Sequence, residues 1–334
     1  MNEEPHPLAP LRSQRGGRRR RSRIPSPSST LPPLRGLGVS SWLKSISGES
    51  QIATRALHQY PMTEIPFVVS PQWLSEHLDD PQIVIVDCRF SLADKELGLL
   101  QYQTSHIRGG HYLDLNHDLS SPVAKHGGRH PLPNPVELAQ KLAAIGINCQ
   151  ETLVVAYDDS RFAFASRLWW LLRYLGHDKV ALLDGGWKSW VSAGYPVTEA
   201  ILMPKQGKFV PEVRSHLVVD IDTVKGRKDL PEVVLVDSRE SDRYRGEREP
   251  IDPIAGHIPS AVNYPWQDVT DEVGRGLPVT DQKLRWSGLE NAQEIIVYCG
   301  SGVTACVNLL SLEIAGIHTG KLYAGSWSDW CSYS

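Results

Sequence analysis

The sequence predicts an α/β protein with two tandem domains, each a parallel sheet flanked by helices, preceded by a disordered N-terminal segment. Two observations support this. From about residue 66 onward, short β-branched apolar runs alternate with longer helical stretches, which is typical of parallel α/β sheets. The chain also repeats itself, because four short motifs occur twice in the same order. A length of 334 residues is sufficient for two ordinary domains.

The clearest predicted strands are apolar runs rich in Val and Ile, two in each half of the chain. They cover residues 83–86, 153–156, 233–236 and 295–297. Residues 163–175 are predicted to form a helix, and residues 308–315 part of another. Each half is therefore expected to hold central strands followed by helices.

The repeated motifs identify the two halves as copies of one domain. The pairs are Asp87-Cys88-Arg89 with Asp237-Ser238-Arg239, Ser105-His106-Ile107 with Gly256-His257-Ile258, Val155-Ala156-Tyr157-Asp158 with Ile296-Val297-Tyr298-Cys299, and Asp184-Gly185-Gly186-Trp187 with Ala324-Gly325-Ser326-Trp327. We predict domains over residues 66–200 and 215–334, joined within the Pro-, Gly- and Lys-containing stretch 195–214.

Residues 1–61 form a basic extension that we predict to be disordered. The segment is rich in Arg, Ser, Pro and Gly and has little apolar periodicity. It resembles an organelle transit peptide in its Arg and Ser content, although Glu3 and Glu4 are unusual there. An alternative is a gene model that starts too early, because Met62 stands just before the first predicted globular element. The sequence leaves both interpretations open.

Composition excludes several classes of protein. The formal net charge of −3 argues against a general nucleic-acid binder, and no run of about 18 apolar residues predicts a membrane span. The five cysteines are odd in number and lack a Cys-x-x-Cys pair, so we expect no disulfide framework and no zinc site. A reducing, cytoplasmic location fits this best, with organelle import directed by the N-terminal segment as the alternative.

Five histidines fall close together in the first half of the chain, and they raise the question of a metal site. They are residues 106, 111, 117, 126 and 130. No carboxylate or thiol stands among them at metal-ligand spacing, so we expect these histidines in loops and on the surface, with no bound metal.

Residues 299–304, which we call the Cys299 loop, are the strongest candidate for chemistry. The run Cys-Gly-Ser-Gly-Val-Thr follows a predicted strand and precedes a predicted helix. A thiolate there would face several backbone N–H groups and the positive end of a helix, which would stabilise it as a nucleophile. The alternative is a buried cysteine that packs as a small hydrophobe. Because Asp158 stands at the equivalent position of the first half, thiol chemistry is impossible there, and that half is predicted to be inactive.

Taken together, these motifs resemble the tandem rhodanese-domain sulfurtransferases over residues 66–334. The resemblance rests on the two Asp-x-Arg motifs, the two His-Ile turns, the Cys299 loop and the closing Gly-Ser-Trp-Ser-Asp-Trp. It implies two rhodanese folds, an active C-terminal domain and a substrate cleft at the interface between the halves.

The resemblance also implies a sulfur donor and a reaction. Thiosulfate enzymes typically carry basic residues directly after the cysteine, whereas Gly300 and Ser301 are similar to the loop of 3-mercaptopyruvate sulfurtransferases. We therefore favour 3-mercaptopyruvate, with thiosulfate second. Cys299 would carry the sulfur as a persulfide and pass it to a thiol, cyanide or thioredoxin, with no metal or organic cofactor.

The expected site residues fall into two groups. The backbone N–H groups that would hold the negative charge of the persulfide belong to Gly300, Ser301, Gly302, Val303 and Thr304. Arg243 matches the family arginine that grips the substrate carboxylate, although Asp242 replaces the usual glycine before it. Arg248 is the candidate for a second carboxylate-binding arginine, and a solvated surface charge is the alternative for both arginines. Ser301 and His106 are the candidates for proton transfer, with a structural histidine as the alternative for His106.

Two other functions fit the sequence less well. A Cys-based phosphatase needs Cys-x5-Arg, and Ala305 stands where the arginine would be. A non-catalytic binding module is the distant alternative for the whole chain, and the retained Cys299 in a glycine-rich loop argues against it.

Overall fold

The computed structural model describes residues 66–203 and 205–334. The predicted disordered extension, residues 1–61, lies outside the described residues. Within the described ranges, no helix is both long and apolar enough to cross a membrane.

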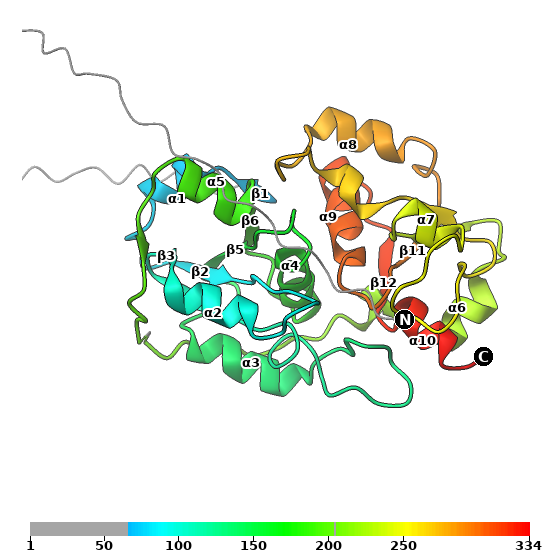
Figure 1. The fold of residues 1–334 in the computed structure, drawn as a ribbon, viewed down its shortest axis with the longest axis horizontal. Helices are drawn as coiled ribbons and strands as arrows, with labels where there is room; N and C mark the ends of the chain where they lie inside the picture. The colour runs from blue at the N-terminus through cyan, green and yellow to red at the C-terminus, as the bar shows by residue number, and fades with distance from the viewer. Residues whose placement is uncertain (1–65, 204) are drawn as a thin grey trace, which may run out of the picture. The chain divides into compact units, whose positions relative to one another are not determined.

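The first half contains a five-stranded parallel sheet flanked by helices (Figure 1). The sheet order is β1-β6-β5-β2-β4, formed by β1 (Val68–Val69), β6 (Val180–Leu183), β5 (Leu153–Tyr157), β2 (Ile83–Asp87) and β4 (Gly110–Tyr112). Its helices are α1 (Pro71–Glu76), α2 (Leu97–Thr104), α3 (Pro135–Ala144), α4 (Ala165–Tyr174) and α5 (Gly186–Ser192). A separate antiparallel pair joins β3 (His106–Ile107) to β7 (Val197–Thr198).

The second half repeats this architecture with the same connectivity. Its parallel sheet has the order β8-β12-β11-β9-β10, formed by β8 (Val218–Val219), β12 (Gly320–Tyr323), β11 (Glu294–Tyr298), β9 (Val233–Asp237) and β10 (Val262–Asn263). Its helices are α6 (Ile221–Arg227), α7 (Ser241–Tyr244), α8 (Val279–Trp286), α9 (Ala305–Ala315) and α10 (Ser326–Cys331), with short 3₁₀ segments η1 (Ser215–Leu217) and η2 (Trp266–Val269).

The predicted elements are confirmed. The four predicted strands lie in β2, β5, β9 and β11, the predicted helix 163–175 contains α4, and the predicted segment 308–315 lies in α9. Every residue of β5 and β11 is buried, which explains why these central strands, apart from Glu294 at the start of β11, are continuous apolar runs and do not alternate with polar residues.

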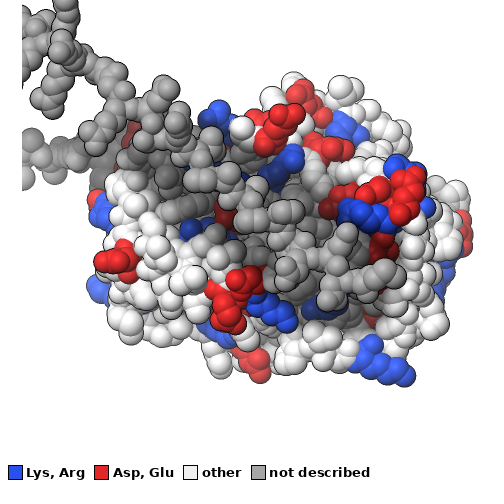
Figure 2. Space-filling model, in the orientation of Figure 1, with Lys and Arg blue, Asp and Glu red and all other residues white. Residues whose placement is uncertain are grey.

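Helices α4 and α9 pack against each other and join the two halves. Leu168 and Trp169 of α4 and Leu309 and Leu312 of α9 belong to one apolar cluster with residues of both sheets. On the face drawn in Figure 2 the Lys and Arg side chains are interspersed with Asp and Glu side chains.

The Asp-x-Arg motifs have a structural role in both halves. Arg89 and Asp87 form a buried ion pair at 2.6 Å, and the same arginine donates to the Ser105 carbonyl at 2.7 Å. In the second half Arg239 pairs with Asp237 at 2.7 Å and donates to a backbone carbonyl in the same way. Each motif thus ties the carboxyl end of a strand to the His-Ile turn.

Candidate functional site

The Cys299 loop connects β11 to α9 and is held against the start of α10. The backbone N–H of Cys299 donates to the Ser326 hydroxyl at 3.1 Å, and its carbonyl accepts from the Trp327 N–H at 3.0 Å. Gly302 has a φ of +76°, and a Cβ there would lie 2.2 Å from the Ala324 carbonyl oxygen. Only glycine fits this position, which explains why the loop carries it.

The backbone N–H groups of the loop after Cys299 have no hydrogen-bond acceptor among the described residues. Within residues 66–203 and 205–334, no hydrogen bond is formed by the backbone N–H groups of residues 300–304. They precede the N-terminus of α9, where the helix dipole adds further positive potential. The loop is therefore suited to hold a negative charge beside Cys299.

The equivalent loop of the first half is filled by a carboxylate of the chain itself. Asp158 accepts hydrogen bonds from the backbone N–H groups of Ser160, Phe162, Phe164 and Ala165, at 2.8, 3.2, 2.9 and 2.8 Å. The side chain is buried, and burial raises its pKa while these N–H groups act in the opposite direction. Asp158 thus occupies the place that a substrate anion would need.

Asp158→Ala is expected to destabilise the protein strongly, because four N–H groups, three of them buried, would lose their acceptor. We expect a loss of about 3 kcal/mol or more in the free energy of unfolding. Urea unfolding would measure it, with Asp159→Ala as the matched control, since Asp159 is partly exposed and should cost well under half as much. Equal losses in the two variants would contradict this role for Asp158.

Cys299 is buried, although it begins a loop. The residue is 2% exposed and contacts the apolar cluster that joins the halves. A polar group also lies near it, because Arg167 of α4 donates to the Gly302 carbonyl at 3.0 Å. Burial lowers the pKa of Arg167, and the nearby Cys306 and Cys299 oppose that shift. No pattern in the sequence singles out Arg167.

Ser301 lies next to a histidine that the sequence analysis had set aside. The Ser301 hydroxyl and His130 Nδ1 are 2.8 Å apart, and both residues are largely buried. Burial, together with the positive charges of Arg167, Arg129 and Lys95, lowers the pKa of His130 to about 3. His130 is therefore a neutral imidazole near neutral pH, and it forms a hydrogen-bonded pair with Ser301 that joins the two halves.

This buried neutral histidine predicts a pH dependence of stability. Between its ordinary pKa of 6.5 and its pKa of about 3 in the folded protein, the unfolded chain binds a proton that the folded protein does not. The free energy of unfolding should therefore fall as pH falls through this window, by about 1.4 kcal/mol per pH unit from this group. Urea unfolding at about pH 6.5 and about pH 5 should show a loss roughly 2 kcal/mol larger in the wild type than in His130→Gln. Identical slopes would contradict the assignment.

Two guanidinium groups lie over the Cys299 loop. A Cβ on Gly300 would be 3.7 Å from both terminal nitrogens of Arg243 and 3.1 Å from Nη2 of Arg129. Asp252 contacts both arginines, and Arg243 also pairs with Glu249 at 2.7 Å. The predicted Arg243 therefore lies at the loop, and Arg129 is a second arginine that the sequence analysis missed.

The structure does not bring Arg248 to the loop. Its side chain is 49% exposed, and its hydrogen bonds both go to Asp242, the nearer at 2.6 Å. The pair forms because Asp242, in place of the family glycine, supplies a carboxylate on the outside of this segment. The second guanidinium at the loop is that of Arg129.

His106 is likewise placed away from the Ser301 pair. Its ring is buried, stacks on Tyr102 and has Nδ1 2.7 Å from the Tyr102 carbonyl. The repeat partner His257 makes the same contacts with Tyr244, at 2.8 Å. These shared contacts favour the structural alternative for His106, and the histidine at the loop is His130.

Comparison with known proteins identifies the family. The model of the rhodanese-like domain matches twice, over residues 70–193 and 220–333. A probable 3-mercaptopyruvate sulfurtransferase from Pseudomonas aeruginosa is 45% identical over 268 residues, which cover 79% of this chain and 94% of that protein. A putative thiosulfate sulfurtransferase from Mycobacterium tuberculosis is 34% identical over 263 residues, covering 76% and 89%.

A solved structure of a related enzyme also matches this chain. The crystal structure of SseA from Escherichia coli, described as a 3-mercaptopyruvate sulfotransferase, matches with a TM-score of 0.69 and 32% identity, covering 78% of this chain and 99% of that one. The predicted fold class and the resemblance to tandem rhodanese-domain enzymes are confirmed. The chain belongs to the rhodanese-like family and is a sulfurtransferase built from two rhodanese domains.

Proposed function

We propose that the protein transfers sulfur from 3-mercaptopyruvate to a thiophilic acceptor through a persulfide on Cys299. The observation that carries this proposal is the Cys299 loop itself, with unused backbone N–H groups beside the thiol and two guanidinium groups over Gly300. An anionic donor would be held by these groups, and no acidic or basic side chain occurs within the loop.

The first half-reaction forms the persulfide. The Cys299 thiolate attacks the sulfur of 3-mercaptopyruvate, a sulfur–sulfur bond forms, and the carbon–sulfur bond breaks with its electron pair going to the pyruvate enolate. The N–H groups of residues 300–304 stabilise the negative charge of the resulting persulfide. Arg243 holds the substrate carboxylate through charge-assisted hydrogen bonds.

Proton transfer is assigned to the Ser301–His130 pair. The donor thiol loses a proton, and carbon 3 of the enolate gains one when pyruvate forms. The neutral His130 takes the proton through the Ser301 hydroxyl and returns it to the enolate. Both residues then regain their initial protonation states. The lowered pKa makes His130 a weak base, so the proton stays on it only transiently before it passes to the enolate.

The second half-reaction releases the sulfur. An acceptor such as a thiol, cyanide or thioredoxin attacks the outer sulfur of the persulfide, and the Cys299 thiolate leaves. No cofactor takes part in either step.

Steady-state kinetics with 3-mercaptopyruvate and with thiosulfate, at saturating cyanide, would test the proposed donor. We expect the larger kcat/KM with 3-mercaptopyruvate. Thiosulfate is the alternative, because two guanidinium groups also suit a compact dianion and a relative is named for that donor. A larger kcat/KM with thiosulfate would overturn the proposed donor and leave the sulfurtransferase assignment intact.

Arg243→Ala should raise the KM for 3-mercaptopyruvate by roughly 10- to 100-fold, because the charge-assisted contact with the carboxylate is lost. Arg245→Ala is the matched control, since Arg245 is 54% exposed and pairs with Glu247 at the surface. An unchanged KM in Arg243→Ala would show that the carboxylate binds elsewhere.

A further inference from the structure

Arg129 belongs to the first half of the chain and lies on the catalytic loop of the second. Its backbone N–H donates to the Ser328 hydroxyl at 3.1 Å. The preceding Gly128 has a φ of +79°, and a Cβ there would lie 2.4 Å from the Gly325 carbonyl oxygen. The backbone before Arg129 is therefore pressed against the start of α10, the helix that also holds the Cys299 loop.

The guanidinium of Arg129 is fixed by an acid that it shares with Arg243. Asp252 contacts both arginines, and its side chain is only 2% exposed. The side chain of Arg129 is 31% exposed, whereas that of Arg243 is 9% exposed. Asp252 thus orients two guanidinium groups side by side over Gly300, and Arg129 is the one that a molecule arriving from solvent can reach more easily.

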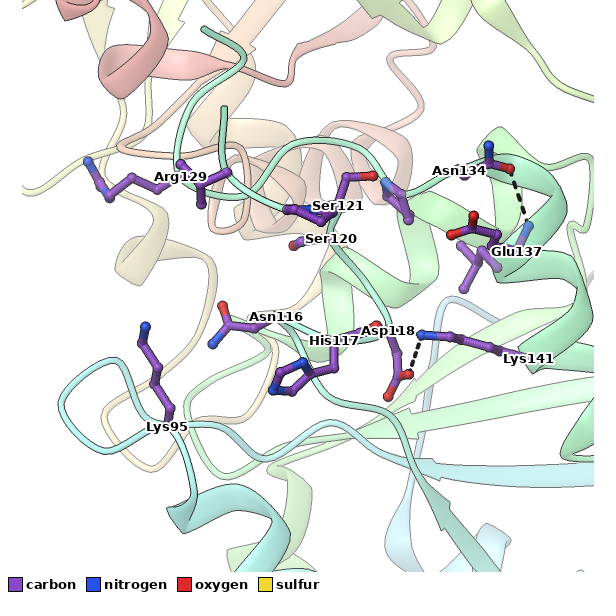
Figure 3. A pocket seen from close by; sticks show the side chains of 14 residues that line it. Lys95, Asn116, His117, Asp118, Ser120, Ser121, Arg129, Asn134, Glu137 and Lys141 are labelled. Carbon is purple, nitrogen blue, oxygen red and sulfur yellow. Dashed lines mark hydrogen bonds and ion pairs between the residues drawn. The ribbon is translucent and has the colours of Figure 1, made fainter. Parts of the chain in front are cut away.

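Arg129 also lines a cavity of about 510 Å³ in the first half (Figure 3). Lys95, Ser120 and Lys141 also line this cavity. Figure 3 shows the Lys141 side chain directed at Asp118, with which it forms an ion pair at 2.6 Å. The Ser120 hydroxyl is buried and has no hydrogen-bond partner among the described residues. The cavity has the size of a small-molecule site, and Arg129 links it to the Cys299 loop.

We propose that Arg129 determines specificity for donors that carry a carboxylate. A donor enters from the cavity, and its carboxylate binds between the guanidinium groups of Arg129 and Arg243, each of which can donate two parallel hydrogen bonds. The first half thus supplies a substrate contact although its own loop is filled by Asp158. This inference rests on the proposed function and adds the residue that selects the donor.

The duplication supplies an internal control for Arg129. Gly128-Arg129 is matched by Gly274-Arg275 in the second half, and Gly274 has a similar φ of +89°. Arg275 lines a cavity of about 450 Å³ at the first half's loop, together with Asp158. Because the carboxylate of Asp158 already occupies the N–H groups of that loop, Arg275 has no substrate anion to select there. The two arginines are equivalent in the fold and differ in the loop that they face.

The test compares Arg129→Gln with Arg275→Gln, using 3-mercaptopyruvate and its neutral analogue mercaptoacetone at saturating cyanide. Arg129→Gln should raise the KM for 3-mercaptopyruvate by roughly 10- to 100-fold and change kcat by less than about threefold. Its kcat/KM for mercaptoacetone should stay within about threefold of wild type, which also shows that the site is folded. Arg129→Lys should recover part of the loss, because it restores the charge without the bidentate geometry. Arg275→Gln should leave both donors unchanged.

A second readout does not depend on turnover. Pyruvate should bind Cys299→Ser more weakly, by roughly tenfold or more, when Arg129→Gln is added, and equally well when Arg275→Gln is added. Equal losses of kcat/KM for both donors in Arg129→Gln, or the same pyruvate affinity in the two double variants, would overturn the inference. Failure of the wild type to use 3-mercaptopyruvate would instead refute the proposed donor, so the two failures are distinguishable.

Discussion

Cys299→Ser is expected to reduce sulfur transfer by at least about a thousandfold with either donor, because a serine hydroxyl is not ionised near neutral pH and cannot hold a sulfur as a persulfide. The side chain of serine is close in size to that of cysteine, so the enclosed site should remain folded. The measurement is kcat/KM for 3-mercaptopyruvate and for thiosulfate with cyanide as acceptor.

Cys149→Ser is the matched control for this variant. Cys149 is a free cysteine of the first half, is partly exposed and lies outside the Cys299 loop. Its replacement should leave both kinetic constants unchanged. Persistent turnover in Cys299→Ser, or an equal loss in Cys149→Ser, would show that the sulfur travels through another thiol.

His130→Ala is expected to lower kcat for 3-mercaptopyruvate by about 100-fold or more, which is the usual contribution of a positioned proton-transfer group. The loss should be much smaller with thiosulfate, because transfer from that donor forms no carbon–hydrogen bond and needs no enolate protonation. The ratio of the two donors' kcat values therefore separates a proton-transfer role from a structural one. Loss of activity to the same extent with both donors would contradict the role of His130.

A double-mutant cycle with Ser301 sharpens this prediction. Since His130 Nδ1 and the Ser301 hydroxyl are 2.8 Å apart and act as one relay, Ser301→Ala should cause most of the same loss. The double variant should be little worse than either single variant. Additive effects would show that the two residues act separately.

The sequence was sufficient to predict the fold because the signals that determine it are local. Runs of buried Val and Ile mark the central strands, and motifs that occur twice mark the two halves. Cys299 and the glycines of its loop could also be predicted as site residues, because the strand, the loop and the helix that form this part of the site are consecutive in the chain. Arg243 was found through family likeness, and it lies at the loop.

The residues that the sequence analysis missed come to the site from the other half of the chain. His130 and Arg129 are more than 150 residues from Cys299. Their placement depends on how one domain packs on the other, which no local pattern encodes. A signal did exist, since Gly-Arg occurs at the equivalent place in both halves, immediately before the segment that leads to α3 or α8. His106 belongs to a repeated motif, and the repetition reflects a structural contact that His257 shares, so the motif does not distinguish a site histidine from a structural one.

Mass spectrometry after exposure to 3-mercaptopyruvate without an acceptor tests the central claim most directly. The protein should gain one sulfur atom on the peptide that contains Cys299, with one equivalent of pyruvate released and no sulfur on the other four cysteines. Addition of cyanide should then remove that sulfur. A protein that releases pyruvate without gaining sulfur on Cys299, or that carries it on another cysteine, would contradict the account.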